Sequence, residues 1–174
     1  MRVLRQGGEN LGAQPCRLGG ARAVTTVDVA KPAIELASRT FVENGLDGSL
    51  HRAVASDVPE FLARAAEADE RHELVIADPP NFAPRHGKLE QALEVYATLH
   101  AASIKLVTPG GLYLAASCSS HVRMGDFLES VREGARREKR VLQVLEQTGA
   151  PFDHPRLLAF PEGDYLKVVL TRVF

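Results

Sequence analysis

Apolar residues along the chain alternate between short continuous runs and stretches with helical spacing. A β-branched run occurs at Ala23–Val27 and a second candidate strand at Leu50–Ala55, and helical spacing follows each of them, in Lys31–Asn44 and Val58–Ala68. A short apolar run bounded by polar turn residues predicts a buried strand, whereas apolar residues at i, i+3 and i+4 predict a helix. This part of the chain therefore predicts two strand-helix units in succession.

The same alternation continues to the C-terminus. Further strands are predicted at Glu73–Ala77, Leu112–Ser117, Val141–Glu146 and Tyr165–Val173, and further helices at Leu89–Val107 and Met124–Lys139. The longer helix is expected to stop before Pro109–Gly111, because proline and glycine favour a turn there. Strands that alternate with helices are typical of a mainly parallel sheet with helices on both faces. The sequence thus predicts a doubly wound α/β fold.

The opening of the chain does not follow this pattern. Arg5–Gly20 is rich in Gly, Gln and Asn and has neither a strand nor a helix period. We expect residues 1–20 to be an irregular or incomplete opening segment of one domain that covers residues 1–174, since no interior linker marks a boundary.

Composition narrows the class of protein. With 174 residues, of which 45% are hydrophobic, the chain can bury one sizeable core. It has no run near the roughly 20 apolar residues of a membrane helix and no signal-peptide pattern, so we expect a cytoplasmic protein. Its two cysteines, Cys16 and Cys118, and its scattered histidines lack metal-ligand spacing, and we expect no metal. A net charge of −1 gives no general attraction to nucleic acid.

Aspartates follow the first two predicted strands. Asp28 comes at the end of one strand and Asp57 at the end of the next. In a nucleotide-binding sheet such carboxylates can accept hydrogen bonds from a ribose or an adenine amino group. Aspartate is equally suited to cap a helix N-terminus, and the residues alone leave both roles open.

Two further strand ends carry groups suited to chemistry. Asp78–Phe82 places an acid before two prolines, which fix the backbone direction and could grip a planar base, with Phe82 either stacking on that base or packing in the core. Cys118 could attack C6 of a pyrimidine in covalent catalysis, and Lys167 or His121 could favour its thiolate. A buried, inert thiol is the alternative for Cys118.

An arginine series marks one face of the predicted helix at Met124–Lys139. Arg132, Arg136 and Arg140 recur at four-residue spacing and could contact phosphates. Glutamates interleave with them, which favours an ordinary solvated face.

Taken together, these motifs resemble the class I S-adenosylmethionine-dependent methyltransferase domain of the large-subunit (23S) ribosomal RNA 5-methylcytosine methyltransferases. The resemblance covers the chain from about Gly19 to Phe174. The matching stretches are Gly19–Asp28, Asp78–Phe82, Pro109–Gly111, Ser117–Ser119, Asp153–Pro155 and Pro161–Lys167. It implies a Rossmann-like sheet of seven mostly parallel strands, with an antiparallel last strand.

The resemblance also implies a function and a set of site residues. The cofactor would be S-adenosylmethionine and the partner RNA, with methyl transfer to C5 of a cytosine in large-subunit ribosomal RNA. Asp28 would hold the cofactor ribose and Asp57 would lie near its adenine. The implied cofactor-binding residues are Asp28, Val29, Asp57, Val58, Asp78 and Pro79, the catalytic residues are Cys118 and Asp78, and the substrate-binding residues are Pro80, Phe82 and Lys167.

The chain departs from this family at several positions. The family opens its domain with a strand, an acid and an aromatic-rich turn, whereas Met1–Leu4 leads into Arg5–Gly12, where that acid and turn are absent. Asn81 stands in place of a common lysine, and His100 replaces a usual asparagine. We expect an N-terminally truncated domain that lacks the family's RNA-binding domain, which would also account for the near-neutral charge.

Other functions stay open at this stage. Methylation of an exocyclic amine on adenine or guanine would also suit an Asp-Pro-Pro motif and needs no cysteine. A truncated, inactive remnant that only binds RNA or a partner would account for the altered opening segment. A dinucleotide dehydrogenase is disfavoured, because no Gly-x-Gly-x-x-Gly stands between a strand and a helix.

Overall fold

The structure is a computed structural model of the chain. It describes residues 1–6, 13–82, 89–151 and 165–174, together with single positions at 154, 155, 157, 159 and 163. The side chains at positions 2, 5, 6 and 13–15 are not described.

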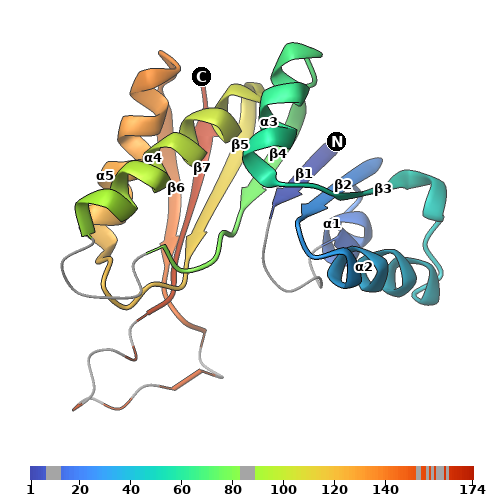
Figure 1. Ribbon diagram of the computed structural model, residues 1–174, viewed down its shortest axis with the longest axis horizontal. Helices are drawn as coiled ribbons and strands as arrows, with labels where there is room; N and C mark the ends of the chain where they lie inside the picture. Colours follow the sequence, from blue (N-terminus) through green and yellow to red (C-terminus); the bar gives the residue numbers. More distant parts are fainter. Residues whose placement is uncertain are drawn as a thin grey trace.

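Seven strands form one sheet (Figure 1). They are β1 (Arg2–Gln6), β2 (Ala23–Asp28), β3 (His51–Ala55), β4 (His72–Ala77), β5 (Val107–Ser117), β6 (Leu142–Thr148) and β7 (Lys167–Val173). Their order is β3-β2-β1-β4-β5-β7-β6. Strands β1 to β5 pair in parallel, and β7 runs antiparallel between β5 and β6. The predicted doubly wound, mostly parallel sheet with an antiparallel last strand is confirmed.

Helices cover the sheet on two sides (Figure 1). They are α1 (Ala13–Leu18), α2 (Lys31–Glu43), α3 (Val58–Glu67), α4 (Leu89–Lys105) and α5 (Met124–Arg137), and a 3-10 turn, η1, spans Gly48–Leu50. Side chains of a strand alternate between its two faces, so Val3 and Leu4 enter different cores. The larger core lies beneath α3, α4 and α5, and the smaller one contains Phe41 of α2.

The opening segment differs from the expectation of irregular structure over residues 1–20. Arg2–Gln6 is the interior strand β1, paired with β2 on one side and β4 on the other, and Ala13–Leu18 is a helix. Two neighbouring strands satisfy the backbone groups of β1 on both sides, and this tertiary pairing outweighs the low strand propensity of its polar residues.

Strand β5 begins earlier than predicted. Val107, expected at the end of the long helix, and Pro109–Gly111, where a turn was expected, already belong to the strand. Gly110 adopts a φ of +78°, and the pairing with β4 shifts in register between His72 and Leu74. The irregularity absorbs the Pro-Gly-Gly sequence without ending the strand, as β-bulges do.

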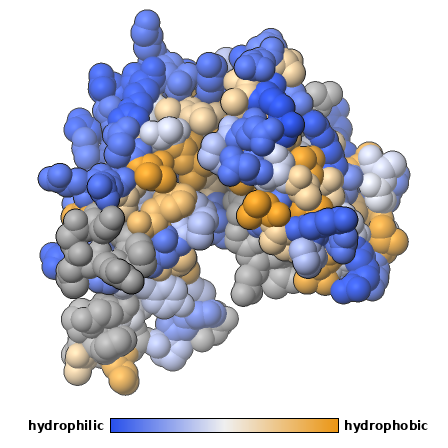
Figure 2. All heavy atoms as spheres, viewed as in Figure 1, coloured by the Kyte–Doolittle hydropathy of each residue, from blue (hydrophilic) through white to orange (hydrophobic). Residues whose placement is uncertain are grey.

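The strand order reverses direction at β1. From β1 the chain builds outward through β2 and β3, then returns to place β4 on the other side of β1. In open α/β sheets, ligands bind at the carboxyl ends of the strands beside such a switch point. In the view of Figure 2, hydrophilic residues gather along the top of the molecule, and hydrophobic residues lie below them, in the middle and along the right side.

Candidate functional site

The aspartates that follow β2 and β3 lie at the same edge of the sheet. Asp28 is the last residue of β2, and its Oδ1 accepts a hydrogen bond from the Ala30 backbone N–H at 2.8 Å. Ala30, not Asp28, is the N-cap of α2. Asp57 does cap a helix, because its Oδ1 accepts from the Glu60 N–H at 3.1 Å. Each carboxylate retains acceptor capacity beyond one hydrogen bond, so neither contact excludes a ligand.

The apolar residues beside these aspartates differ in exposure. The side chain of Val29 is 76% exposed, so it forms part of the surface of this edge. Val58 is the first residue of α3 and is half-buried against the larger core.

The Asp-Pro-Pro segment leaves the sheet at the end of β4. Asp78 is half-buried, Pro79 is buried and Pro80 is exposed. Phe82 packs against the larger core, with its ring 5.0 Å from the Tyr96 ring in an edge-on arrangement. Of the two roles expected for Phe82, this geometry shows core packing.

Cys118 follows β5 and is exposed. Because β4 and β5 are parallel neighbours, paired at Ala77 and Ala115, the thiol and the Asp78 carboxylate extend beyond the same edge of the sheet. The buried residues on either side of Cys118 contact each other, since the Ser119 N–H donates to Ser117 Oγ at 3.3 Å. The thiol is therefore presented from a turn with a buried base, which excludes the alternative of an inert thiol in the core.

Lys167 lies beneath that turn. It is the first residue of β7 and only 4% exposed. Its Nζ donates to the backbone oxygens of Ser119 and of Tyr165, the latter at 2.7 Å. A direct contact between this ammonium and a substrate would compete with these hydrogen bonds.

Tyr96 lies at the site, although no sequence motif points to it. It lies in α4, fully buried, and its hydroxyl is 2.9 Å from Ser117 Oγ. Burial raises the pKa of Tyr96, with smaller upward effects from the nearby Cys118 and Asp78. Its place in the pattern of Leu89–Val107 indicates only a helix. The signal that could have found it is the partner that a buried tyrosine hydroxyl needs.

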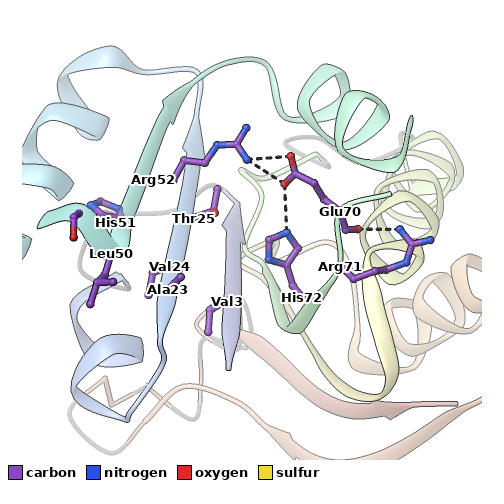
Figure 3. A pocket seen from close by; sticks show the side chains of 11 residues that line it. Val3, Ala23, Val24, Thr25, Leu50, His51, Arg52, Glu70, Arg71 and His72 are labelled. Carbon is purple, nitrogen blue, oxygen red and sulfur yellow. Dashed lines mark hydrogen bonds and ion pairs between the residues drawn. The ribbon is translucent and has the colours of Figure 1, made fainter. Parts of the chain in front are cut away.

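A cavity of about 350 Å³ lies at the opposite edge of the sheet (Figure 3). The first residues of β2, β3 and β4 line it, so it is open at the amino ends of the strands. Arg52 pairs with Glu70 at 3.0 Å, and His72 Nε2 lies 3.9 Å from the same carboxylate. Arg52 and Glu70 neutralise each other, and the cavity is separate from the edge that carries Asp28, Asp78 and Cys118.

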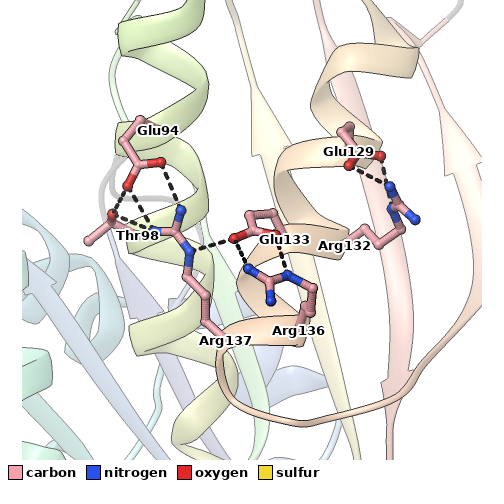
Figure 4. Close-up of polar contacts among 7 residues, drawn as sticks. All are labelled: Glu94, Thr98, Glu129, Arg132, Glu133, Arg136 and Arg137. Atoms are coloured by element: carbon pink, nitrogen blue, oxygen red, sulfur yellow. Dashed lines mark hydrogen bonds and ion pairs between the residues drawn. The ribbon is translucent and has the colours of Figure 1, made fainter.

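The arginines of α5 form ion pairs on the protein surface (Figure 4). Arg132 pairs with Glu129 at 2.6 Å and Arg136 with Glu133 at 2.7 Å. Arg137 bridges Glu133 to Glu94 of α4. Hydrogen bonds from Arg136 and then Arg137 lower the pKa of Glu133 to about 2. This arrangement agrees with a solvated face rather than with a free phosphate-binding surface.

No cluster of three or more His, Cys, Asp or Glu residues suited to a metal occurs in the part of the chain that the structure describes. None of the described helices combines the length and apolarity that a membrane span needs. The motif residues Asp153, Pro161, Glu162 and Asp164 lie outside the described residues.

Comparison with known proteins supports the resemblance. A "Ribosomal RNA large subunit methyltransferase" from Deinococcus radiodurans is 35% identical over 156 residues, which are 89% of this chain and 38% of the relative. A "Ribosomal RNA large subunit methyltransferase I" from Klebsiella pneumoniae is 33% identical over 156 residues, which are 90% of this chain and 39% of the relative. No protein-family model matches the chain.

A solved structure shares the fold. It is described as that of a methyltransferase complexed with SAH (S-adenosylhomocysteine), and it superimposes with a TM-score of 0.86 at 24% identity. The match covers 98% of this chain and 44% of the other. The chain thus has a methyltransferase fold and spans less than half the length of the curated relatives named above.

Proposed function

We propose that this chain transfers a methyl group from S-adenosylmethionine to a base of large-subunit ribosomal RNA. The observation that carries the proposal is the position of Cys118 and Asp78 beyond neighbouring strand ends, at the edge where this fold binds ligands. The likeness to ribosomal RNA large subunit methyltransferases supports RNA as the substrate. We further propose C5 of cytosine as the methylated atom. That carbon becomes nucleophilic only when a thiol adds to the ring, and the site presents the exposed thiol of Cys118.

The residues at this edge fit S-adenosylmethionine. Asp28 offers a carboxylate for the two ribose hydroxyls, and Asp57 offers one near the adenine. Val29 is exposed at the same edge and suits an apolar wall of the cofactor site. Val58 and Pro79, which follow other strand ends at this edge, suit the same role. When bound, the cofactor supplies an electrophilic methyl group on a sulfonium. The residues of the chain hold it and align the base with it.

Cys118 acts on the base itself. Its thiolate adds to C6 of the cytosine, which makes C5 nucleophilic. Once C5 carries the methyl group, a proton acceptor removes the C5 proton, the C5–C6 double bond reforms and Cys118 leaves as the thiolate. Exposure of Cys118 allows this approach by a base splayed out of the RNA. Asp78 and Pro80 border the same space, and we propose that they orient the base.

A substitution of Cys118 tests this mechanism. We expect Cys118→Ala to abolish transfer of a labelled methyl group to a large-subunit ribosomal RNA transcript, with SAH binding unchanged. Cys16→Ala is the matched control, because Cys16 packs beside the smaller core, away from this edge, and should retain activity. If Cys118→Ala methylates RNA as the wild type does, the covalent mechanism is wrong and exocyclic-amine methylation, which needs no thiol, becomes the better proposal.

A further inference from the structure

Tyr96 contacts both segments that carry the proposed catalytic groups. Its hydroxyl is 2.9 Å from Ser117 Oγ, at the end of β5. Its ring packs edge-on against Phe82, at the end of the Asp-Pro-Pro segment, with 5.0 Å between the ring centroids. One side chain of α4 thus links the segment after β4 to the segment after β5.

The residues on both sides of Cys118 are held from below. Ser117 Oγ, which contacts the Tyr96 hydroxyl, also accepts the Ser119 N–H. Lys167 donates to the Ser119 carbonyl. Ser117, Ser119 and Lys167 are all buried, whereas Cys118 between them is exposed. The position of the thiol is therefore set by buried polar contacts and not by packing of its own side chain.

The Tyr96 ring has a fixed place without its hydroxyl. It packs edge-on against Phe82 and against Phe127, at centroid distances of 5.0 and 5.5 Å. Aromatic packing of this kind holds the ring through burial and ring geometry. Removing only the hydroxyl would leave the ring in position and take away one hydrogen-bond partner of Ser117.

We propose that Tyr96 is a positioning residue: through Ser117 its hydroxyl fixes Sγ of Cys118 relative to the Asp78–Phe82 segment. The inference rests on the proposed function, since it assigns Tyr96 a role only if Cys118 is the nucleophile. Tyr96 does not touch the base. It acts by holding two loops at the separation that the reaction needs, and a displacement of about 1 Å in such a site can reduce the rate by about 100-fold.

Tyr96→Phe tests the role of the hydroxyl in catalysis. We expect kcat for methyl transfer to an RNA transcript to fall roughly 10- to 100-fold, with KM for RNA and SAH affinity changed less than about twofold. Tyr113→Phe is a matched control, because Tyr113 is also fully buried and its hydroxyl contacts His100 Nδ1 at 2.6 Å, away from Cys118. The control should lose a buried hydrogen bond while keeping kcat.

A double substitution tests whether the hydroxyl acts through Ser117. Tyr96→Phe combined with Ser117→Ala should reduce kcat no further than Ser117→Ala alone, because both changes break the same connection. Independent effects would instead multiply. Multiplied losses, or a Tyr96→Phe enzyme that raises KM and leaves kcat unchanged, would contradict the proposal.

A measurement without catalysis separates this proposal from the proposed function. We expect backbone hydrogen exchange at Ser119 to become about tenfold faster in Tyr96→Phe and to stay unchanged in Tyr113→Phe. Unchanged exchange at Ser119 in Tyr96→Phe would overturn the positioning role even if Cys118 proves essential. If exchange rises but Cys118→Ala retains full activity, the contact exists but the proposed function fails, and the catalytic role of Tyr96 fails with it.

Discussion

The protonation state of His100 depends on its burial. It is fully buried in α4, and its Nδ1 lies 2.6 Å from the Tyr113 hydroxyl. Burial lowers the pKa of His100 to about 3, and burial also raises the pKa of Tyr113. Both groups are therefore neutral near pH 7, which removes the cost of a buried charge. From the sequence, His100 stands out only as a residue that replaces a usual asparagine, because its spacing shows a helix face but no partner.

The neutral state of His100 should make stability depend on pH. Below its ordinary pKa of about 6.5 the unfolded residue takes up a proton, whereas the folded residue does not until about pH 3, so acid favours unfolding. From pH 7.5 to pH 5.5 the free energy of unfolding should fall by roughly 1.4 kcal/mol through His100 alone. Urea denaturation at the two pH values should show that the free energy of unfolding of His100→Asn falls by about 1.4 kcal/mol less than that of the wild type.

The control for this measurement is a histidine at the surface. His121→Asn, in the loop after β5, removes a part-exposed imidazole and should retain the His100 contribution. His51, half-buried with a pKa lowered by burial, adds a contribution in the same direction that is common to both variants. If the free energy of unfolding falls equally in His100→Asn and in the wild type between pH 7.5 and pH 5.5, His100 is not kept neutral by the fold.

At the scale of elements, α4 and α5 pack closely at one glycine. A Cβ on Gly134 of α5 would lie 2.6 Å from the His100 Cβ and 2.8 Å from the Ala101 backbone nitrogen in α4. Neither atom is the end of a flexible side chain, so one helix would have to move. We expect Gly134→Ala to lower the free energy of unfolding by about 1–3 kcal/mol, measured by urea denaturation.

A second glycine in the same helix provides the comparison. A Cβ on Gly125 would meet nothing within 4 Å, so Gly125→Ala should raise stability by about 0.4–1 kcal/mol through a less flexible unfolded chain. If Gly134→Ala and Gly125→Ala change the free energy of unfolding equally, the close contact between α4 and α5 does not make an alanine at position 134 destabilising.

The elements also show what could be predicted from sequence. Helices α2, α3 and α5 each carry an apolar stripe against a polar face, and their predicted bounds agree with the structure to within two residues. Strand β1 could not be predicted in this way, because pairing with strands far along the chain determines it and its own residues are largely polar. The contact between Tyr96 and Ser117 was missed for the same reason, since it joins residues from different elements.

At the scale of the molecule, the proposed site draws on segments that are distant in sequence. Four different strands end at or just before the proposed site residues Asp28, Asp57, Asp78 and Cys118, and the sheet order brings those strand ends to one edge. The sequence predicted this edge, because the carboxyl ends of parallel strands face the same way. It could not predict which side chains hold the turn around Cys118, because the contacts made by Lys167 and Tyr96 depend on tertiary packing.

Because the site exists only in the folded chain, cofactor binding should stabilise the whole molecule. SAH at about 100 times its dissociation constant should add about 2.7 kcal/mol to the free energy of unfolding and raise Tm by about 5–10 °C.

Asp28→Asn keeps an acceptor for the Ala30 N–H but loses the carboxylate, so calorimetric titration should show SAH binding weakened about tenfold. Glu43→Gln, which removes one exposed charge at the far end of α2, should bind as the wild type does. Equal affinities in the two variants would remove Asp28 from the proposed cofactor site, and no binding by the wild type would count against a methyltransferase role for this chain.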